Sequence, residues 1–128
     1  MAHKKAQTDP ALLAGWLYAI VLLGCVVLTY AFVFPATEWP TYIVWLISCS
    51  LGTFVIYALD KGAAIVGLLR APELLLHLAA LAGGFVGGWL GMLVWHHKVR
   101  KQMFYVVLSA ATLVHTAIIY YVFFMSGH

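Results

Sequence analysis

The chain has 128 residues, of which 65% are hydrophobic and 9% are charged, and its formal net charge is +3. A soluble domain carries about 25% charged residues, so this composition excludes a water-soluble globular protein and indicates an integral membrane protein. No basic stripe with interleaved aromatic residues is present, so we expect no nucleic-acid partner. The positive charge instead suits contact with anionic lipid head groups.

The first ten residues form a polar, basic tail, and residues 11–128 contain four long apolar runs. Each run has roughly the 20 residues that a helix needs to cross the hydrocarbon core, and a helix satisfies its own backbone groups in lipid. The first run is too long for a signal-peptide core and no cleavage pattern follows it, so we expect it to be retained. These runs, which we expect to form one four-helix transmembrane domain, cover residues 11–34, 41–59, 73–95 and 104–125.

The stretch GAAIVGLL, residues 62–69, is apolar but too short to span a membrane. It could form a surface-lying or partly buried helix, with Lys61 and Arg70 at its ends. We therefore expect an all-α integral membrane protein with four transmembrane helices and a short interfacial or re-entrant segment between helices two and three.

The third apolar run is rich in glycine, which leaves two interpretations of residues 73–95 open. Small residues every four positions form a flat stripe that lets another helix approach closely, and this favours a straight helix. The glycines could instead break the run into a re-entrant hairpin, which would place all seven Lys and Arg on one side of the membrane. With four crossings, four Lys and Arg would lie on one side of the membrane and three on the other, a difference to which the positive-inside rule barely applies. For that arrangement we expect cytoplasmic termini. The glycines expected to pack helices are Gly83, Gly84, Gly87, Gly88 and Gly91.

Charged residues concentrate in the stretch DKGAAIVGLLRAPELLLH, residues 60–77. At 100° per residue, Glu73 and His77 share the glycine face of the third helix, and Arg70 lies close enough to pair with Glu73. If the second and third helices pack together, these groups meet near one membrane surface. The cluster either neutralises charge and pins helix ends, or binds a head group, ion or substrate. Its expected members are Tyr57, Asp60, Lys61, Arg70, Glu73 and His77.

A metal site is a weaker possibility. Glu73 and His77 have the spacing that places two ligands on one helix face, but zinc needs three or four converging ligands. In a straight third helix, His77 and His97 would lie about 30 Å apart. We therefore expect no metal site, and the sequence names no cofactor.

Two further polar features leave alternatives open. The basic turn HHKVRKQMF contains His97, Lys98 and Lys101; it either anchors the protein at anionic lipid or binds a phosphate-bearing ligand. His115 near the middle of the last helix is either a neutral, hydrogen-bonded histidine or a proton relay or cofactor ligand. No phosphate-binding glycine loop or nucleophile elbow is present, which argues against an enzyme.

Four ordered motifs carry a resemblance to a known family. They are Tyr57-x-x-Asp60-Lys61-x-x-Ala64, Arg70-x-Pro72-Glu73-x-x-Leu76-His77, Gly83-Gly84-x-x-Gly87 and His97-Lys98-x-x-Lys101-x-x-Phe104. The region around residues 50–105 resembles domain of unknown function 1294, a group of small bacterial membrane proteins. One departure is the apolar link between Lys61 and Arg70, where the family usually has a basic segment. The resemblance implies a compact helical protein of the bacterial inner membrane whose polar signature is Asp60, Lys61, Arg70, Glu73, His77, His97, Lys98 and Lys101, and it implies no activity.

Three functions compete. The first is a small accessory or interaction protein that packs against a larger membrane complex or forms a homo-oligomer, as the glycine stripe suggests. The alternative is a site for an anionic lipid or another phosphate-bearing ligand at the polar cluster. A third is an enzyme or transporter that uses Glu73 and His77 for proton chemistry, although four helices leave little room for an alternating pathway.

Overall fold

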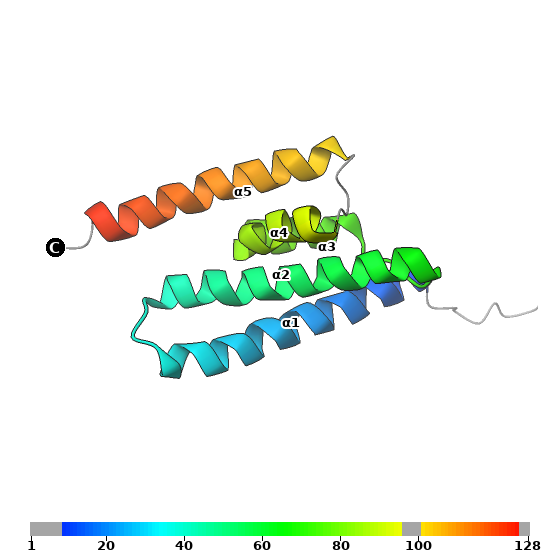
Figure 1. Ribbon diagram of the computed structural model, residues 1–128, viewed down its shortest axis with the longest axis horizontal. Helices are drawn as coiled ribbons and strands as arrows, with labels where there is room; N and C mark the ends of the chain where they lie inside the picture. The colour runs from blue at the N-terminus through cyan, green and yellow to red at the C-terminus, as the bar shows by residue number, and fades with distance from the viewer. Residues whose placement is uncertain (1–8, 96–100, 126–128) are drawn as a thin grey trace, which may run out of the picture.

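The computed structural model describes residues 9–95 and 101–125, and every element in these two ranges is helical (Figure 1). Four segments are long and apolar enough to cross a membrane, namely Leu12–Ala36, Thr41–Val66, Glu73–Trp95 and Gln102–Met125. This confirms the predicted all-α class. The elements are α1 (Pro10–Ala36), α2 (Thr41–Val66), α3 (Glu73–Ala79), η1 (Ala80–Gly84), α4 (Phe85–Trp95), α5 (Gln102–Tyr120) and η2 (Tyr121–Met125).

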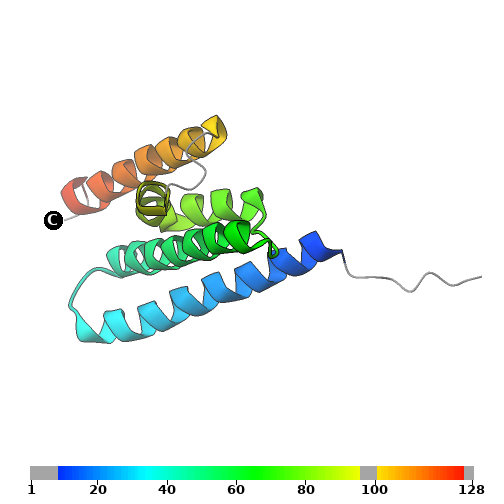
Figure 2. The ribbon, with the colours of Figure 1, turned by 45° about the vertical axis from the view of Figure 1, so that its right-hand side comes forward.

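α1 and α2 form a long antiparallel pair, and α3 and α4 lie between α2 and α5 (Figures 1 and 2). α2 does not end at Leu59 as predicted but continues through Asp60 and Lys61 to Val66. Gly67 then ends it in the left-handed conformation (φ 76°), and the Leu68 N–H donates to the Ala63 carbonyl at 2.9 Å. The expected separate helix over residues 62–69 is therefore absent, because most of that stretch is the last turn and a half of α2.

The third apolar segment is not the straight helix that we favoured. Gly83 has φ 136° and ψ −3°, a combination that glycine adopts readily and that residues with a Cβ rarely do. The helical path therefore breaks at Gly83, with η1 before the break and α4 after it. Figure 2 shows the consequence, since α4 is seen nearly end-on while α3 is seen from the side.

Contacts with α5 show that α3 runs from the first turn of α5 towards its middle. The His77 ring lies 4.4 Å from the ring of Phe104, in the first turn of α5. Four residues later, the Leu81 carbonyl is 2.9 Å from Nε2 of His115, three turns further along α5. α3 and α5 thus point in the same direction.

After the break, the contacts of α4 return along α5 in the opposite order. The Phe85 ring stacks on His115 at 5.1 Å, and the Trp89 ring lies 6.1 Å from Tyr105, back near the start of α5. Residues 73–95 are therefore folded back at Gly83 into two short helices, called here the re-entrant hairpin. α4 crosses its neighbours obliquely and ends with the Trp95 ring 5.5 Å from the Phe54 ring, near the middle of α2.

The break would leave backbone carbonyls unpaired at membrane depth, where no water satisfies them. Side chains from α2 and α5 contact the three carbonyls of the apex. Trp45 Nε1 donates to the Ala82 carbonyl at 2.8 Å, His115 Nε2 to Leu81, and Ser50 Oγ to Gly83 at 3.3 Å. The carbonyl groups of the hairpin apex are thus hydrogen-bonded to side chains of the protein itself.

The glycines of the hairpin lie against neighbours within the chain. A Cβ at Gly87 would lie 1.8 Å from the backbone oxygen of Ser50 in α2, and one at Gly88 would lie 2.5 Å from Leu108 Cδ2 in α5. Gly84 and Gly91 approach α2 in the same way. The predicted small-residue surface therefore packs the hairpin between α2 and α5.

α1 begins at one end of the bundle and α5 ends at the other (Figure 1). The start of α1 and the end of α5 therefore lie at opposite ends of the bundle (Figure 1), unlike the arrangement expected of four full crossings. Three segments run the length of the bundle, and the re-entrant hairpin turns back at Gly83 towards the end from which it started. This end, at which α1 begins and α2 finishes, is called the charged end below.

Candidate functional site

The site is built first on Asp60, whose side chain is fully buried in the last turns of α2 (0% exposed). A buried carboxylate must be paired, and two neighbours meet this need. The Ala71 N–H donates to Oδ1 at 2.8 Å, and Arg70 Nη2 lies 3.6 Å from Oδ2. Asp60 therefore fastens the connection between α2 and α3 and holds Arg70, which is 47% exposed, at the surface.

A second ion pair joins the hairpin to α5. Lys101 Nζ, immediately before α5, contacts Glu73 Oε1 at the first residue of α3. The predicted pairing of Arg70 with Glu73 is thus replaced by two other pairs. Both side chains are about half exposed, and such pairs contribute about 0–1 kcal/mol. The contact matters mainly because it places the start of the hairpin beside the start of α5.

Phe104 forms the aromatic centre of the same end and is fully buried. The His77 ring lies against one side of it, and the Tyr57 ring, also fully buried, meets it edge-on at 6.2 Å. Side chains from α2, α3 and α5 therefore converge there. We call Tyr57, Asp60, Arg70, Glu73, His77 and Lys101 the charged-end cluster.

The remaining predicted site residues are placed differently. Lys61 is half-buried on α2, about 100° around the helix from Asp60. His97 and Lys98 lie outside the described residues. In the ranges 9–95 and 101–125, no three His, Cys, Asp or Glu side chains come together as metal ligands.

His115 lies away from the cluster and is buried at the hairpin apex. A carbonyl can only accept, so Nε2 carries the proton that is donated to Leu81. Nδ1 then accepts from the Tyr42 hydroxyl at 2.5 Å. Both ring nitrogens therefore have a hydrogen-bond partner, which is the arrangement of a structural histidine.

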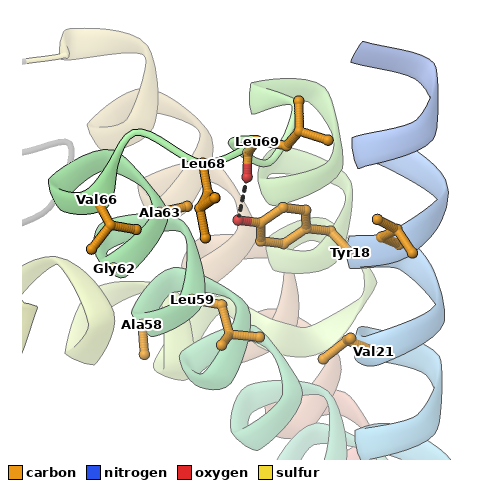
Figure 3. A pocket seen from close by; sticks show the side chains of 10 residues that line it. Tyr18, Val21, Ala58, Leu59, Gly62, Ala63, Val66, Leu68 and Leu69 are labelled. Carbon is orange, nitrogen blue, oxygen red and sulfur yellow. Dashed lines mark hydrogen bonds between the residues drawn. The ribbon is translucent and has the colours of Figure 1, made fainter. Parts of the chain in front are cut away.

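Sequence reasoning missed Tyr18 of α1, because it stands in an almost uniformly apolar run. Its hydroxyl donates to the Leu69 carbonyl at 3.0 Å, next to Arg70 (Figure 3). The Tyr18 ring also lines an apolar groove of about 500 Å³ between α1, α2 and the loop after α2. The resemblance does not cover α1, so no motif could have indicated Tyr18.

Together these features define a small multi-helical membrane protein with a polar site at one end of its bundle. Residues 50–104 match the family described as "Protein of unknown function (DUF1294)", which confirms the predicted resemblance for this part of the chain. The match begins in the middle of α2 and ends at Phe104, so it spans the whole charged-end cluster. No curated protein and no solved structure matches the chain.

Proposed function

We propose that the charged-end cluster binds a phosphate-bearing ligand, with Arg70 as the residue that contacts the phosphate. The observation that carries this proposal is a half-exposed guanidinium whose position is fixed by a fully buried carboxylate. A guanidinium has five N–H donors in a planar fork, so one edge can face Asp60 while another faces a phosphate. Its geometry suits bidentate phosphate contacts.

The charge balance of the described part of the cluster supports an anionic ligand. Arg70, Lys101 and the neighbouring Lys61 supply three positive charges against the two carboxylates of Asp60 and Glu73. One of those carboxylates is buried beneath Arg70. An approaching phosphate therefore meets the guanidinium before it meets Asp60.

We also propose that the charged end faces the cytoplasm of a bacterial cell, in its inner membrane. Lys61, Arg70 and Lys101 belong to this end, and Lys98 and Arg100 are within three residues of Lys101 in the sequence. Lys4 and Lys5 precede α1, which begins there. A re-entrant hairpin gathers all seven Lys and Arg on the side that the positive-inside rule assigns to the cytoplasm, and the end of α5 is then periplasmic.

The accessory role in a larger complex stays a prediction. It was motivated by a glycine stripe that could receive a partner helix, but Gly84, Gly87, Gly88 and Gly91 are closely packed against α2 and α5. The phosphate site therefore has the stronger structural support.

In the test, purified protein in neutral detergent is mixed with phosphatidylglycerol in one arm and with glycerol phosphate in the other. Binding is measured by native mass spectrometry. We expect Arg70→Ala to weaken binding by at least about tenfold, because a hydrogen bond to a charged group contributes about 1.5–3 kcal/mol. Lys61→Ala, which removes an equal charge one position beyond Asp60, is the comparison variant and should weaken binding less than Arg70→Ala, because it removes only longer-range attraction. Equal binding by wild type and Arg70→Ala in both arms would refute the proposal.

A further inference from the structure

We propose that the ligand is an anionic lipid, and that one of its acyl chains lies in the groove between α1 and α2 (Figure 3). This inference rests on the proposed function, because it places the lipid phosphate on Arg70. It adds the class of ligand and a second contact surface, of which only the α1 wall lies outside the family match.

The groove has the size and chemistry of a hydrocarbon site. Its volume is about 500 Å³, within the usual range of about 300–1,000 Å³ for ligand sites. One wall is α1, the other is the last three turns of α2, and the loop after α2 covers one end (Figure 3). The lining is aliphatic apart from one tyrosine: Leu17, Tyr18, Val21, Ala58, Leu59, Gly62, Ala63, Val66, Leu68 and Leu69.

The tyrosine does not make the groove polar, because the Tyr18 hydroxyl is directed to the Leu69 carbonyl at 3.0 Å. This bond satisfies a phenol and a loop carbonyl with one another. What the groove then offers is mainly aromatic and aliphatic carbon, which suits an acyl chain and disfavours a polar occupant.

The head-group contact and the groove are formed by the same short loop. Leu68 and Leu69 line the groove, and Arg70 follows directly in the sequence. The buried Asp60 fixes this loop through the Ala71 N–H. A lipid phosphate on Arg70 is therefore close to the covered end of the groove, and its chain can continue along α1 and α2 towards the membrane centre.

The two contacts have different roles in selecting the ligand. Lipid tails are as apolar as leucine, so moving a chain from the bilayer into the groove yields no hydrophobic gain. The groove supplies packing contacts, each of which is small. Phosphatidylcholine carries the same phosphate, so the preference for an anionic over a zwitterionic lipid must come from the positive charges of Lys61, Arg70 and Lys101, which disfavour choline. The groove distinguishes a lipid from a water-soluble phosphate.

Gly62 allows the groove to be filled without disturbing the fold. A Cβ at this position meets no heavy atom within 4 Å, so its direction is open. Gly62→Leu would place a side chain where the acyl chain is proposed to lie. Gly24→Leu is the matched control, because Gly24 is also a helical glycine with open space at its Cβ but does not line the groove.

The experiment compares retention of phosphatidylglycerol and of phosphatidylcholine with identical chains, by native mass spectrometry of the full chain in neutral detergent. We expect wild type and Gly24→Leu to prefer phosphatidylglycerol, and Gly62→Leu to retain it roughly fivefold less, because several packing contacts are lost together. Binding of glycerol phosphate should be unchanged by Gly62→Leu. If Gly62→Leu is not monodisperse, Ala58→Leu fills the same groove from the preceding turn.

The outcomes separate the two proposals. If Arg70→Ala loses phosphatidylglycerol while both groove variants keep it, the groove assignment is wrong and the phosphate site stands. If Arg70→Ala has no effect on either probe, the phosphate site fails and the lipid assignment fails with it. Equal retention of phosphatidylcholine and phosphatidylglycerol by wild type would also overturn the anionic lipid.

Discussion

Gly87→Ala is the substitution that most directly tests the packing of the re-entrant hairpin. An added Cβ would lie 1.8 Å from the Ser50 carbonyl oxygen and 2.6 Å from its carbon. Ordinary contact begins at 3.4 Å, so α4 and α2 would have to separate by up to 1.6 Å (3.4 minus 1.8). The Ser50 oxygen belongs to a helix backbone and the added Cβ is bonded directly to one, so neither atom can turn away as the end of a flexible side chain can.

The energetic consequence follows from this geometry. Overpacking of a core typically costs about 1–3 kcal/mol, and a clash between two helix backbones should fall at or above the upper value. Replacing glycine by alanine inside a helix would by itself gain up to about 1 kcal/mol. We therefore expect a net loss of about 2 kcal/mol in the free energy of unfolding.

The measurement is unfolding of the purified protein in mixed micelles, followed by circular dichroism as the fraction of denaturing detergent rises. Gly24→Ala is the control, because no heavy atom lies within 4 Å of the added Cβ; it should be neutral or slightly stabilising. If Gly87→Ala is as stable as Gly24→Ala, α4 does not lie against α2 as described.

Substitutions at three other positions probe separate parts of the structure. Gly83→Ala forces a residue with a Cβ to φ 136° and should cost about 1–3 kcal/mol; an unchanged unfolding curve would contradict the break. Asp60→Ala removes the acceptor of the Ala71 N–H and should cost about 2 kcal/mol, whereas Asp60→Asn, which keeps an acceptor, should cost less; equal losses would contradict the role of this bond. His115→Phe keeps the ring but removes the donor to Leu81, and a loss of about 1 kcal/mol is expected; greater stability than wild type would argue against sealing of the apex.

The helical class and the position of the polar site could be predicted from the sequence. The apolar runs have spanning length, and stretch 60–77 contains the acids and bases that the structure gathers at one end. The ion-pair partners of these residues could not be predicted, because they depend on the path of the loop between α2 and α3. Arg70 pairs with the buried Asp60 behind it, and Glu73 pairs with Lys101, which is 28 residues away.

The glycine spacing of residues 73–95 does not by itself predict the re-entrant hairpin, because two different structures would produce the same spacing. Small residues at every fourth position suit a straight helix that receives a partner, and they equally suit two short helices packed within the chain. The charge distribution was the better indicator, since only the hairpin gathers all seven Lys and Arg on one side. The sequence around Trp45, Ser50 and His115 does not indicate that their side chains contact the apex. These side chains bind carbonyl groups that become free only because the helix breaks at Gly83.

The most direct test of the hairpin is the proximity of residues 73 and 101 in native membranes. With Cys25 and Cys49 replaced by alanine, Glu73→Cys and Lys101→Cys are introduced together and treated with a short bifunctional thiol reagent. The ion pair between Glu73 and Lys101 predicts an efficient intramolecular crosslink, and a control pair of Glu73→Cys with Met125→Cys should give none. A straight third helix would separate the ends of residues 73–95 by about 33 Å, so failure of the first pair to crosslink would contradict the re-entrant hairpin.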